Sequence, residues 1–295
     1  MHTALDDLKK NISPRMREFR RTLHLIRMMP LSMISLTIII IFFLVAIFAP
    51  FISPYNPYKI NVPERVLPPS KEHLMGTDAL GRDIFSRIIF GTRVSMTIGF
   101  IVILGSSLIG IIFGLVAGYL GGIVDEIIMR LTDMFLAFPG IILAMAFVSA
   151  MKPSLQSTLF ALSIVSWPGY TRLVRGTVLT VKEQAFVEAA RATGEGQFSI
   201  IFRHILPNVL SPIVVQLTLS LGRAIMQAST LGFIGLGVPP PTPEWGGMAA
   251  EGRTFITNQW WMSTFPGIAI FIAVMAFNLL GDGLRDALDP RLRYR

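Results

Sequence analysis

The 295-residue chain contains no cysteine. Without a thiol it can form no disulfide, no zinc–thiolate site, no iron–sulfur cluster and no cysteine nucleophile. Charge is also scarce, because Asp, Glu, Lys and Arg make up only 15% of the residues, against about 25% in an average soluble protein. This deficit argues against a soluble fold.

Two further absences exclude classes of enzyme. The four histidines, His2, His24, His73 and His204, have no metal-ligand spacing and no context for a Ser-His-Asp arrangement. The sequence also has no Gly-x-x-x-x-Gly-Lys-Ser/Thr segment and no Gly-Lys dipeptide, so the chain itself supplies no Walker-A nucleotide site. We therefore expect neither a membrane hydrolase nor an ATPase.

Apolar residues, by contrast, are abundant. They make up 52% of the chain, and the mean hydropathy is +0.61. Long uncharged runs recur along the sequence, as the hydrocarbon of a bilayer requires, so the chain is expected to be a polytopic membrane protein. The net charge of +8 can indicate nucleic-acid binding. Basic residues beside apolar spans more often orient those spans, so no nucleic-acid partner is expected.

Six apolar segments are long enough to predict membrane-spanning helices. The first covers about 28 Å at 1.5 Å per residue, close to the thickness of the hydrocarbon core. A cleaved signal peptide is the alternative for this segment, but its apolar core is too long and about thirty residues precede it. The predicted spans are residues 31–49, 94–119, 127–151, 155–174, 209–231 and 263–280.

The distribution of Lys and Arg predicts the orientation of these spans. Segments on one side carry 17 of the 26 basic residues, and segments on the other side carry eight. Because short cytoplasmic segments keep positive charge, both termini are expected in the cytoplasm. Arg223 is left inside the fifth predicted span.

The internal segment 175–208 is the most informative connection. Thr180 and Glu183 have capping-box spacing, which predicts a helix from there until Gly194 stops it. Alanines at 185, 189 and 192 share one stripe of this helix, where small side chains allow another backbone to approach. A second short helix follows before the next span. On spacing alone, a simple link between two spans is an equally good interpretation of this hairpin.

Three short segments in this hairpin favour a functional role over a simple link. The segments Glu188-Ala189-Ala190, Gly194 and Leu206-Pro207 resemble the EAA loop of inner-membrane permeases of ABC importers. His204 stands where that pattern usually has an aliphatic residue, which leaves the anchors intact. Further segments resemble the C-type permease of dipeptide, oligopeptide and nickel importers. They are Gly76-Thr77-Asp78, Gly81-Arg82-Asp83, Leu231-Gly232-Phe233-Ile234-Gly235-Leu236-Gly237, Pro241-Thr242-Pro243-Glu244-Trp245-Gly246 and Asn278-Leu279-Leu280-Gly281-Asp282-Gly283.

The resemblance spans residues 31–292 and implies the type I ABC importer permease fold. This fold is all-α, with six transmembrane helices and a cytoplasmic EAA coupling-helix hairpin. Residues 1–90 would hold the N-terminal cytoplasmic tail, the first transmembrane helix and an external segment. Residues 91–295 would form the five-helix permease core, with the EAA loop at 180–208. The implied location is the cell (inner) membrane.

The resemblance also implies a function and partners. The chain is expected to form half of the translocation pathway for di- or oligopeptides or a related small solute. Expected partners are a second homologous permease subunit, two ATP-binding subunits that bind ATP and Mg, and an extracytoplasmic solute-binding protein. An ATP-independent secondary transporter or channel is the alternative of a different class. The residues implied in coupling to the ATPases are Glu188, Ala189, Ala190, Gly194, Leu206 and Pro207.

A few residues inside or beside the predicted spans suggest packing or pathway roles. Gly110, Gly114 and Gly118 form a small-xxx-small face, expected to pack on a neighbouring span of the same chain rather than on a partner. Arg223 is a candidate pathway residue, because a cation within a span is costly and faces protein or water. Asp133 is expected to pair with Arg130 one turn away.

Two prolines and three tryptophans are also expected to have structural roles. Prolines 139 and 168 are expected to kink the third and fourth spans. Tryptophans 245, 260 and 261 are expected in an interfacial aromatic belt. The pathway itself is expected to be largely apolar, with few groups that select a substrate.

Overall fold

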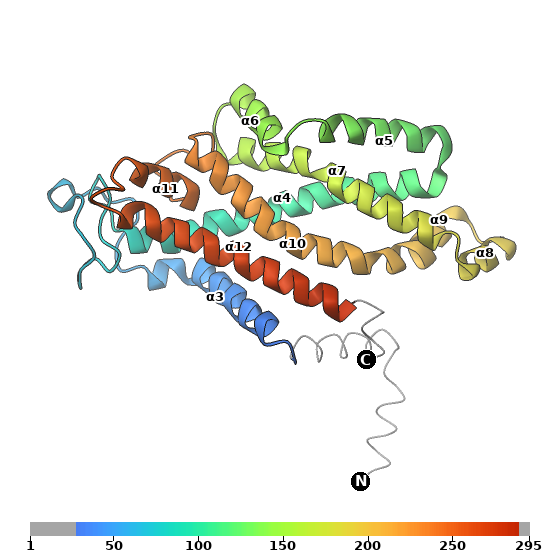
Figure 1. Ribbon diagram of the computed structural model, residues 1–295, viewed down its shortest axis with the longest axis horizontal. Helices are drawn as coiled ribbons and strands as arrows, with labels where there is room; N and C mark the ends of the chain where they lie inside the picture. Colours follow the sequence, from blue (N-terminus) through green and yellow to red (C-terminus); the bar gives the residue numbers. More distant parts are fainter. Residues whose placement is uncertain (1–27, 289–295) are drawn as a thin grey trace, which may run out of the picture.

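The computed structural model describes residues 28–288, which form a helical protein. Figure 1 shows a long molecule in which the helices run roughly along one axis. The elements in chain order are α3 (Pro30–Ile52), η1 (Val62–Glu64), α4 (Ile84–Leu120), α5 (Gly122–Leu136), α6 (Gly140–Met151), α7 (Leu155–Val181), α8 (Ala185–Ala192), α9 (Gln197–Ser199), η2 (Ile200–Ile205), α10 (Leu206–Phe233), α11 (Trp245–Arg253) and α12 (Trp261–Leu288).

Four helices are long and apolar enough to cross a membrane. They are α3, α4, α12 and the continuous helix Gln197–Phe233, which joins α9, the π-helical turn η2 and α10. Four of the six predicted spans are thereby confirmed as apolar helices. Helix α4 has 37 residues, about 55 Å at 1.5 Å per residue. It is therefore longer than the hydrocarbon core and starts ten residues before the predicted span.

The third predicted span is not one helix. Helices α5 and α6 are bent by 86° at a short break, so together they form either one broken span or a re-entrant element. Pro139 is the residue before α6. Proline has no N–H for the helix ladder and disfavours helical geometry in the residue before it. The kink expected at Pro139 is therefore a complete break.

The fourth predicted span is a helix, but it is less apolar than the four long helices above. Helix α7 is 27 residues long and carries Pro168 within it, but it is not among the helices apolar enough to span on length and composition. Its second half contains Arg172 and Arg175. The described residues thus show four apolar spans, or five if α5 and α6 count as one.

Helices α4 and α7 pack closely along the predicted glycine face. A Cβ atom added at Gly114 would lie 2.6 Å from Cβ of Val174, and one added at Gly118 would lie 2.8 Å from Cβ of Val178. Both distances are too short for any real side chain. The glycines therefore allow two helices of the same chain to touch, as expected.

The two ends of the molecule carry different structures. Helix α8 and its turn project from one end, whereas α11 and the segment between α3 and α4 cover the other (Figure 1). Along one side, α3 lies next to α12 and α4. The main apolar core lies between these long helices and includes Val102, Leu162, Ala228 and Ala273.

The tryptophans differ from the expected aromatic belt. Trp245 is 0% exposed and Trp261 is 7% exposed. The indole N–H of Trp245 donates to the carbonyl of Ile88 over 3.1 Å, which ties α11 to α4. Only Trp260 is half exposed. Trp245 and Trp261 therefore anchor the fold instead of facing an interface with lipid.

Candidate functional site

The hairpin that contains α8 does not begin with a capping box. Helix α7 continues to Val181, and α8 begins after Gln184, which makes no side-chain cap. The hydroxyl of Thr180 instead donates to the carbonyl of Gly176 inside α7. The predicted cap is wrong because α7 extends past Thr180, so its backbone is already helical there.

One face of α8 packs inward. Val187 is 0% exposed and Ala190 is 7% exposed. They join a small apolar core that also contains Val181, Ile200 and Ile205. Ala190, one of the predicted coupling residues, thus packs inward and anchors α8 to the rest of the chain, and its coupling role stays a prediction.

The opposite face of α8 is open. Glu188 and Ala189 are exposed, and so are Ala185 and Ala192, which complete the predicted alanine stripe. Glu188 has no ion pair among the described residues. The guanidinium of Arg191 lies 5.8 Å from the ring centre of Tyr119. The face is therefore free to receive another protein.

Gly194 makes the turn that ends α8. Its φ angle is +77°, in the left-handed region that glycine adopts readily. The amide of Gly194 donates to Arg191, and the amide of Glu195 donates to Ala190, so the last carbonyls of α8 have partners. The predicted stop at Gly194 is confirmed. A Cβ there would meet no atom within 4 Å, so the constraint lies in the backbone.

A polar contact closes the hairpin after the turn. The carboxylate of Glu195 lies 2.8 Å from Nε2 of His204 and also accepts from the hydroxyl of Ser199. These hydrogen bonds, from Ser199 first and then His204, lower the pKa of Glu195. In the EAA-loop pattern, His204 stands in place of an aliphatic residue. No spacing signal links it to Glu195, because only the turn brings the two together.

The hairpin connects directly to a long helix. The π-helical turn η2 continues without a break into α10, and Pro207 occupies its first turn. Leu206 and Pro207 are both partly buried. The predicted coupling residues thus fall into two groups. Glu188, Ala189 and Gly194 are exposed on the hairpin, whereas Ala190, Leu206 and Pro207 hold it to α10.

A cavity of about 160 Å³ lies between α4, α6, α7 and α10. Arg223 lines it from α10, and Gln216, Ser220 and Gln227 extend the same wall. Tyr170 of α7 also lines the cavity. Apolar side chains, among them Ile103 and Val165, complete the lining. The sequence signal that was missed is the spacing of positions 216, 220, 223 and 227, which places them on one face of a helix.

The ion pair of Asp133 differs from the expected one. Asp133 pairs with Arg172 of α7, with 2.6 Å between the charged atoms, and not with Arg130. Arg130 pairs with Glu126 one turn before it. The bend between α5 and α6 lets α5 lie along α7, so a tertiary partner replaces the local one.

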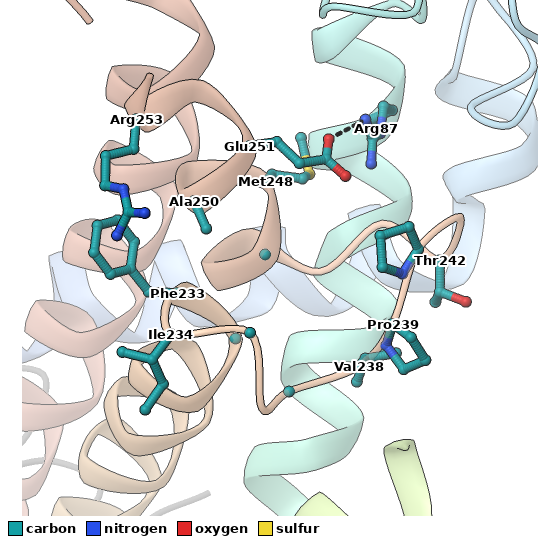
Figure 2. Close-up of a pocket in the computed structure, with 15 residues that line it drawn as sticks. Arg87, Phe233, Ile234, Val238, Pro239, Thr242, Met248, Ala250, Glu251 and Arg253 are labelled. Carbon is teal, nitrogen blue, oxygen red and sulfur yellow. Dashed lines mark hydrogen bonds and ion pairs between the residues drawn. The ribbon is translucent and has the colours of Figure 1, made fainter. Parts of the chain in front are cut away.

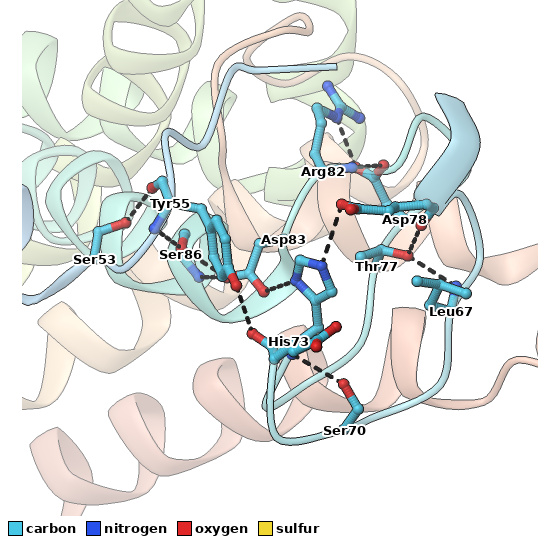
Figure 3. A network of polar contacts seen from close by, with 12 residues as sticks. Ser53, Tyr55, Leu67, Ser70, His73, Thr77, Asp78, Arg82, Asp83 and Ser86 are labelled. Carbon is cyan, nitrogen blue, oxygen red and sulfur yellow. Dashed lines mark hydrogen bonds and ion pairs between the residues drawn. The ribbon is translucent and has the colours of Figure 1, made fainter. Parts of the chain in front are cut away.

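The external segment is held by a buried polar network, shown in Figure 3. Asp83 precedes α4 and accepts from the amide of Ser86 over 2.7 Å. The imidazole of His73 lies 2.9 Å from the other oxygen of Asp83 and stacks near Tyr55. Asp83 is therefore the N-cap of α4.

A second group of charges links this segment to α11. Arg82 and Arg87 each lie 2.9 Å from the carboxylate of Glu251, and both also bind Asp78. Asp78 and the two arginines are almost completely buried. Four charges paired in this way fix the start of α4 against α11.

A larger cavity of about 410 Å³ lies beside this group, between α4, α11 and the segment after α10. Figure 2 shows Arg87 and Glu251 on one wall, and Arg253 beside the ring of Phe233. Gly235 also lines this cavity, and its φ of +83° permits the turn that follows α10. No cluster of His, Asp and Glu that fits a metal ion occurs within residues 28–288.

Comparisons with known proteins agree with this geometry. Residues 110–294 match the family described as binding-protein-dependent transport system inner membrane component, and residues 19–69 match the N-terminal TM domain of oligopeptide transport permease C. The chain is 48% identical to the dipeptide transport system permease protein DppC of Alkalihalophilus pseudofirmus, over 89% of this chain and 86% of that protein. It is 44% identical to the probable D,D-dipeptide transport system permease protein DdpC of Escherichia coli, over 89% and 88%.

Solved structures show the same fold. A chain of the MetNI methionine ABC transporter in an inward-facing conformation aligns with a TM-score of 0.59 at 19% identity, over 70% of this chain and 98% of that one. A chain of an amino acid ABC transporter aligns with a TM-score of 0.54 at 14% identity, over 67% and 92%.

Proposed function

Because this chain belongs to the family of binding-protein-dependent transport system inner membrane components, we propose that the α8 hairpin is the surface through which ATP hydrolysis on other subunits moves it. The chain is a permease subunit of an ABC importer for di- or oligopeptides. The observation that carries the coupling proposal is the exposed face with Glu188 and Ala189, on a hairpin continuous with α10.

The physical argument for coupling is rigidity. Val187 and Ala190 fix α8 to the apolar core, and Glu195 with His204 closes the turn. Helix η2 passes into α10 without a loop, so a displacement of the hairpin is transmitted along a helix of 37 residues. A flexible link would absorb such a movement. This construction is what a mechanical contact requires.

The arrangement in the membrane follows from the same proposal. Six spans are expected if α5 with α6 and also α7 cross the bilayer within the assembled importer. The α8 hairpin then lies in the cytoplasm, and both termini lie on that side, outside the described residues. Residues 1–90 and 91–295 form separate functional parts, a division that the two family matches, at 19–69 and 110–294, support.

The proposed assembly supplies what this chain lacks. Two ATPase subunits bind ATP and Mg and dock on the hairpins, while a homologous permease completes the pathway. A solute-binding protein delivers the peptide to the external side, where the network around Asp78 and Arg82 holds a rigid surface. Arg223 lines the pathway between these two ends.

Site-directed crosslinking tests the proposed coupling surface. The chain has no cysteine, so a single Ala189→Cys change gives one reactive site on it. In the assembled importer, a short crosslinker at this site should capture an ATPase subunit. Lys71→Cys, exposed at the opposite end, is the matched control and should not. Capture of an ATPase from position 71, or none from position 189, would overturn the proposal.

A further inference from the structure

Arg223 lines the cavity between α7 and α10, is exposed in this single chain and has no counter-charge within residues 28–288. Arg223 lies ten residues before Phe233 at the end of α10, which places it about 15 Å inside the helix end. That depth is near the middle of a hydrocarbon core about 30 Å thick. Arg223 belongs to none of the ion pairs or side-chain hydrogen bonds found within residues 28–288. An unpaired arginine at this depth is a functional feature by default.

A second, independent group in the cavity also lacks a partner. Tyr170 is 2% exposed, and its hydroxyl makes no hydrogen bond within the described part of the chain. A buried hydroxyl without a partner is unfavourable and unusual. Tyr170 and Arg223 line the same cavity from different helices. Both groups can donate to an acceptor on a ligand, and the hydroxyls of Ser106 and Ser220 are the polar neighbours of the Tyr170 hydroxyl among the described residues.

The remaining lining points to the same ligand chemistry. Gln216 and Gln227 contribute amide groups, and Ser166 and Ser220 contribute hydroxyls. Among the described residues, no Asp or Glu lines the cavity. A site with a guanidinium, neutral donors and no carboxylate favours an anion over a cation. The guanidinium also has the fork geometry that binds a carboxylate through two hydrogen bonds.

Resting on the proposed role in peptide import, we infer that this cavity binds the C-terminal carboxylate of the peptide during its passage. Every unmodified peptide carries this group whatever its side chains, so the site recognises peptides as a class. The volume of about 160 Å³ accommodates a carboxylate with several waters, since one water needs about 10–15 Å³. The α-ammonium group is left to the homologous permease.

The experiment measures protection of a cysteine in the cavity. Ser166→Cys introduces a thiol of similar size on the cavity wall, in a chain with no other cysteine. The complete importer carrying this change is treated with a maleimide, without binding protein or ATP, and labelling is read on this subunit. Three probes are added separately, namely alanyl-alanine, N-acetyl-alanyl-alanine and alanyl-alanine amide.

The two probes with a free carboxylate should slow labelling, and the amide should not. Adding Arg223→Gln should weaken this protection by about tenfold or more, the effect of losing one charge-assisted hydrogen bond. Arg223→Lys should retain part of it, because the charge remains without the fork. Arg253→Gln, at the external cavity, is the matched control and should leave protection unchanged.

Equal protection by the amide or unchanged protection after Arg223→Gln would overturn the inference. Dissociation of the permease pair by Arg223→Gln would also overturn it, because Arg223 would then be an interface residue. Uptake of alanyl-alanine by the unmodified importer with its binding protein is measured in parallel. If ATP-dependent uptake occurs without protection, the cavity assignment fails and the proposed function stands. If no ATP-dependent uptake occurs, the proposed function fails first.

Discussion

A valine at Gly194 tests whether the shape of the hairpin turn matters for transport. The native φ of +77° lies in a region that costs an ordinary residue roughly 1–2 kcal/mol. A β-branched residue is a genuine outlier there. A Cβ would meet no atom of this chain within 4 Å, so the whole effect acts through the backbone. About 1–2 kcal/mol shifts the population of the native turn by a factor of about 5–30.

The expected result is a large loss of coupled activity with normal insertion. Gly194→Val should lower ATP-dependent peptide uptake and transport-coupled ATP hydrolysis in proteoliposomes, while the subunit remains in the membrane at the normal level. Gly194→Asn is the matched control, because asparagine tolerates a positive φ better than other residues. It should retain much more activity than the valine variant.

Two outcomes would refute this reasoning. Full uptake by Gly194→Val would show that the turn does not transmit movement. Equal loss in Gly194→Val and Gly194→Asn would show that side-chain volume at the ATPase contact is the cause, and not the φ angle.

Other predictions concern helix packing, pH and the external network. Gly114→Val should reduce thermal stability of the purified subunit by about 1–3 kcal/mol through overpacking against α7, whereas Gly169→Ala, with no atom within 4 Å of the added Cβ, should be nearly neutral. The pKa of Glu195 is lowered in the folded hairpin, so its contribution is present above the ordinary value of about 4.3 and is lost as pH falls through the folded value. Protection of the hairpin amides against hydrogen exchange, taken relative to the intrinsic exchange rate at each pH, should fall in that acid range, and Glu195→Gln should remove this pH dependence. Asp78→Asn should lower stability by about 3–5 kcal/mol, as for other broken buried ion pairs, measured as a drop in the unfolding temperature.

Two features were predictable because they depend on the local sequence, namely the end of α8 and the glycine face of α4. Gly194 stops α8 at the predicted residue, since only the backbone of that turn is involved. The glycine face of α4 also follows directly from its four-residue spacing. The capping box at Thr180 failed for the opposite reason, because α7 extends beyond its apolar stretch.

Residue pairs at the site were not predictable, because folding brings distant positions together. Asp133 has a local candidate in Arg130, yet it binds Arg172, 39 positions away. Glu195 meets His204 only through the turn at Gly194.

The sequence by itself determined that this is a multi-pass membrane protein and that it resembles the importer permeases. Those conclusions rest on composition and on short anchored segments, which are properties of neighbouring residues. Only the tertiary structure decided that Ala190 faces inward while Ala189 faces outward, and that Arg223 shares a polar cavity with Tyr170. The physical reason is that burial, and the loss or gain of a partner for a polar group, depend on which helices pack together.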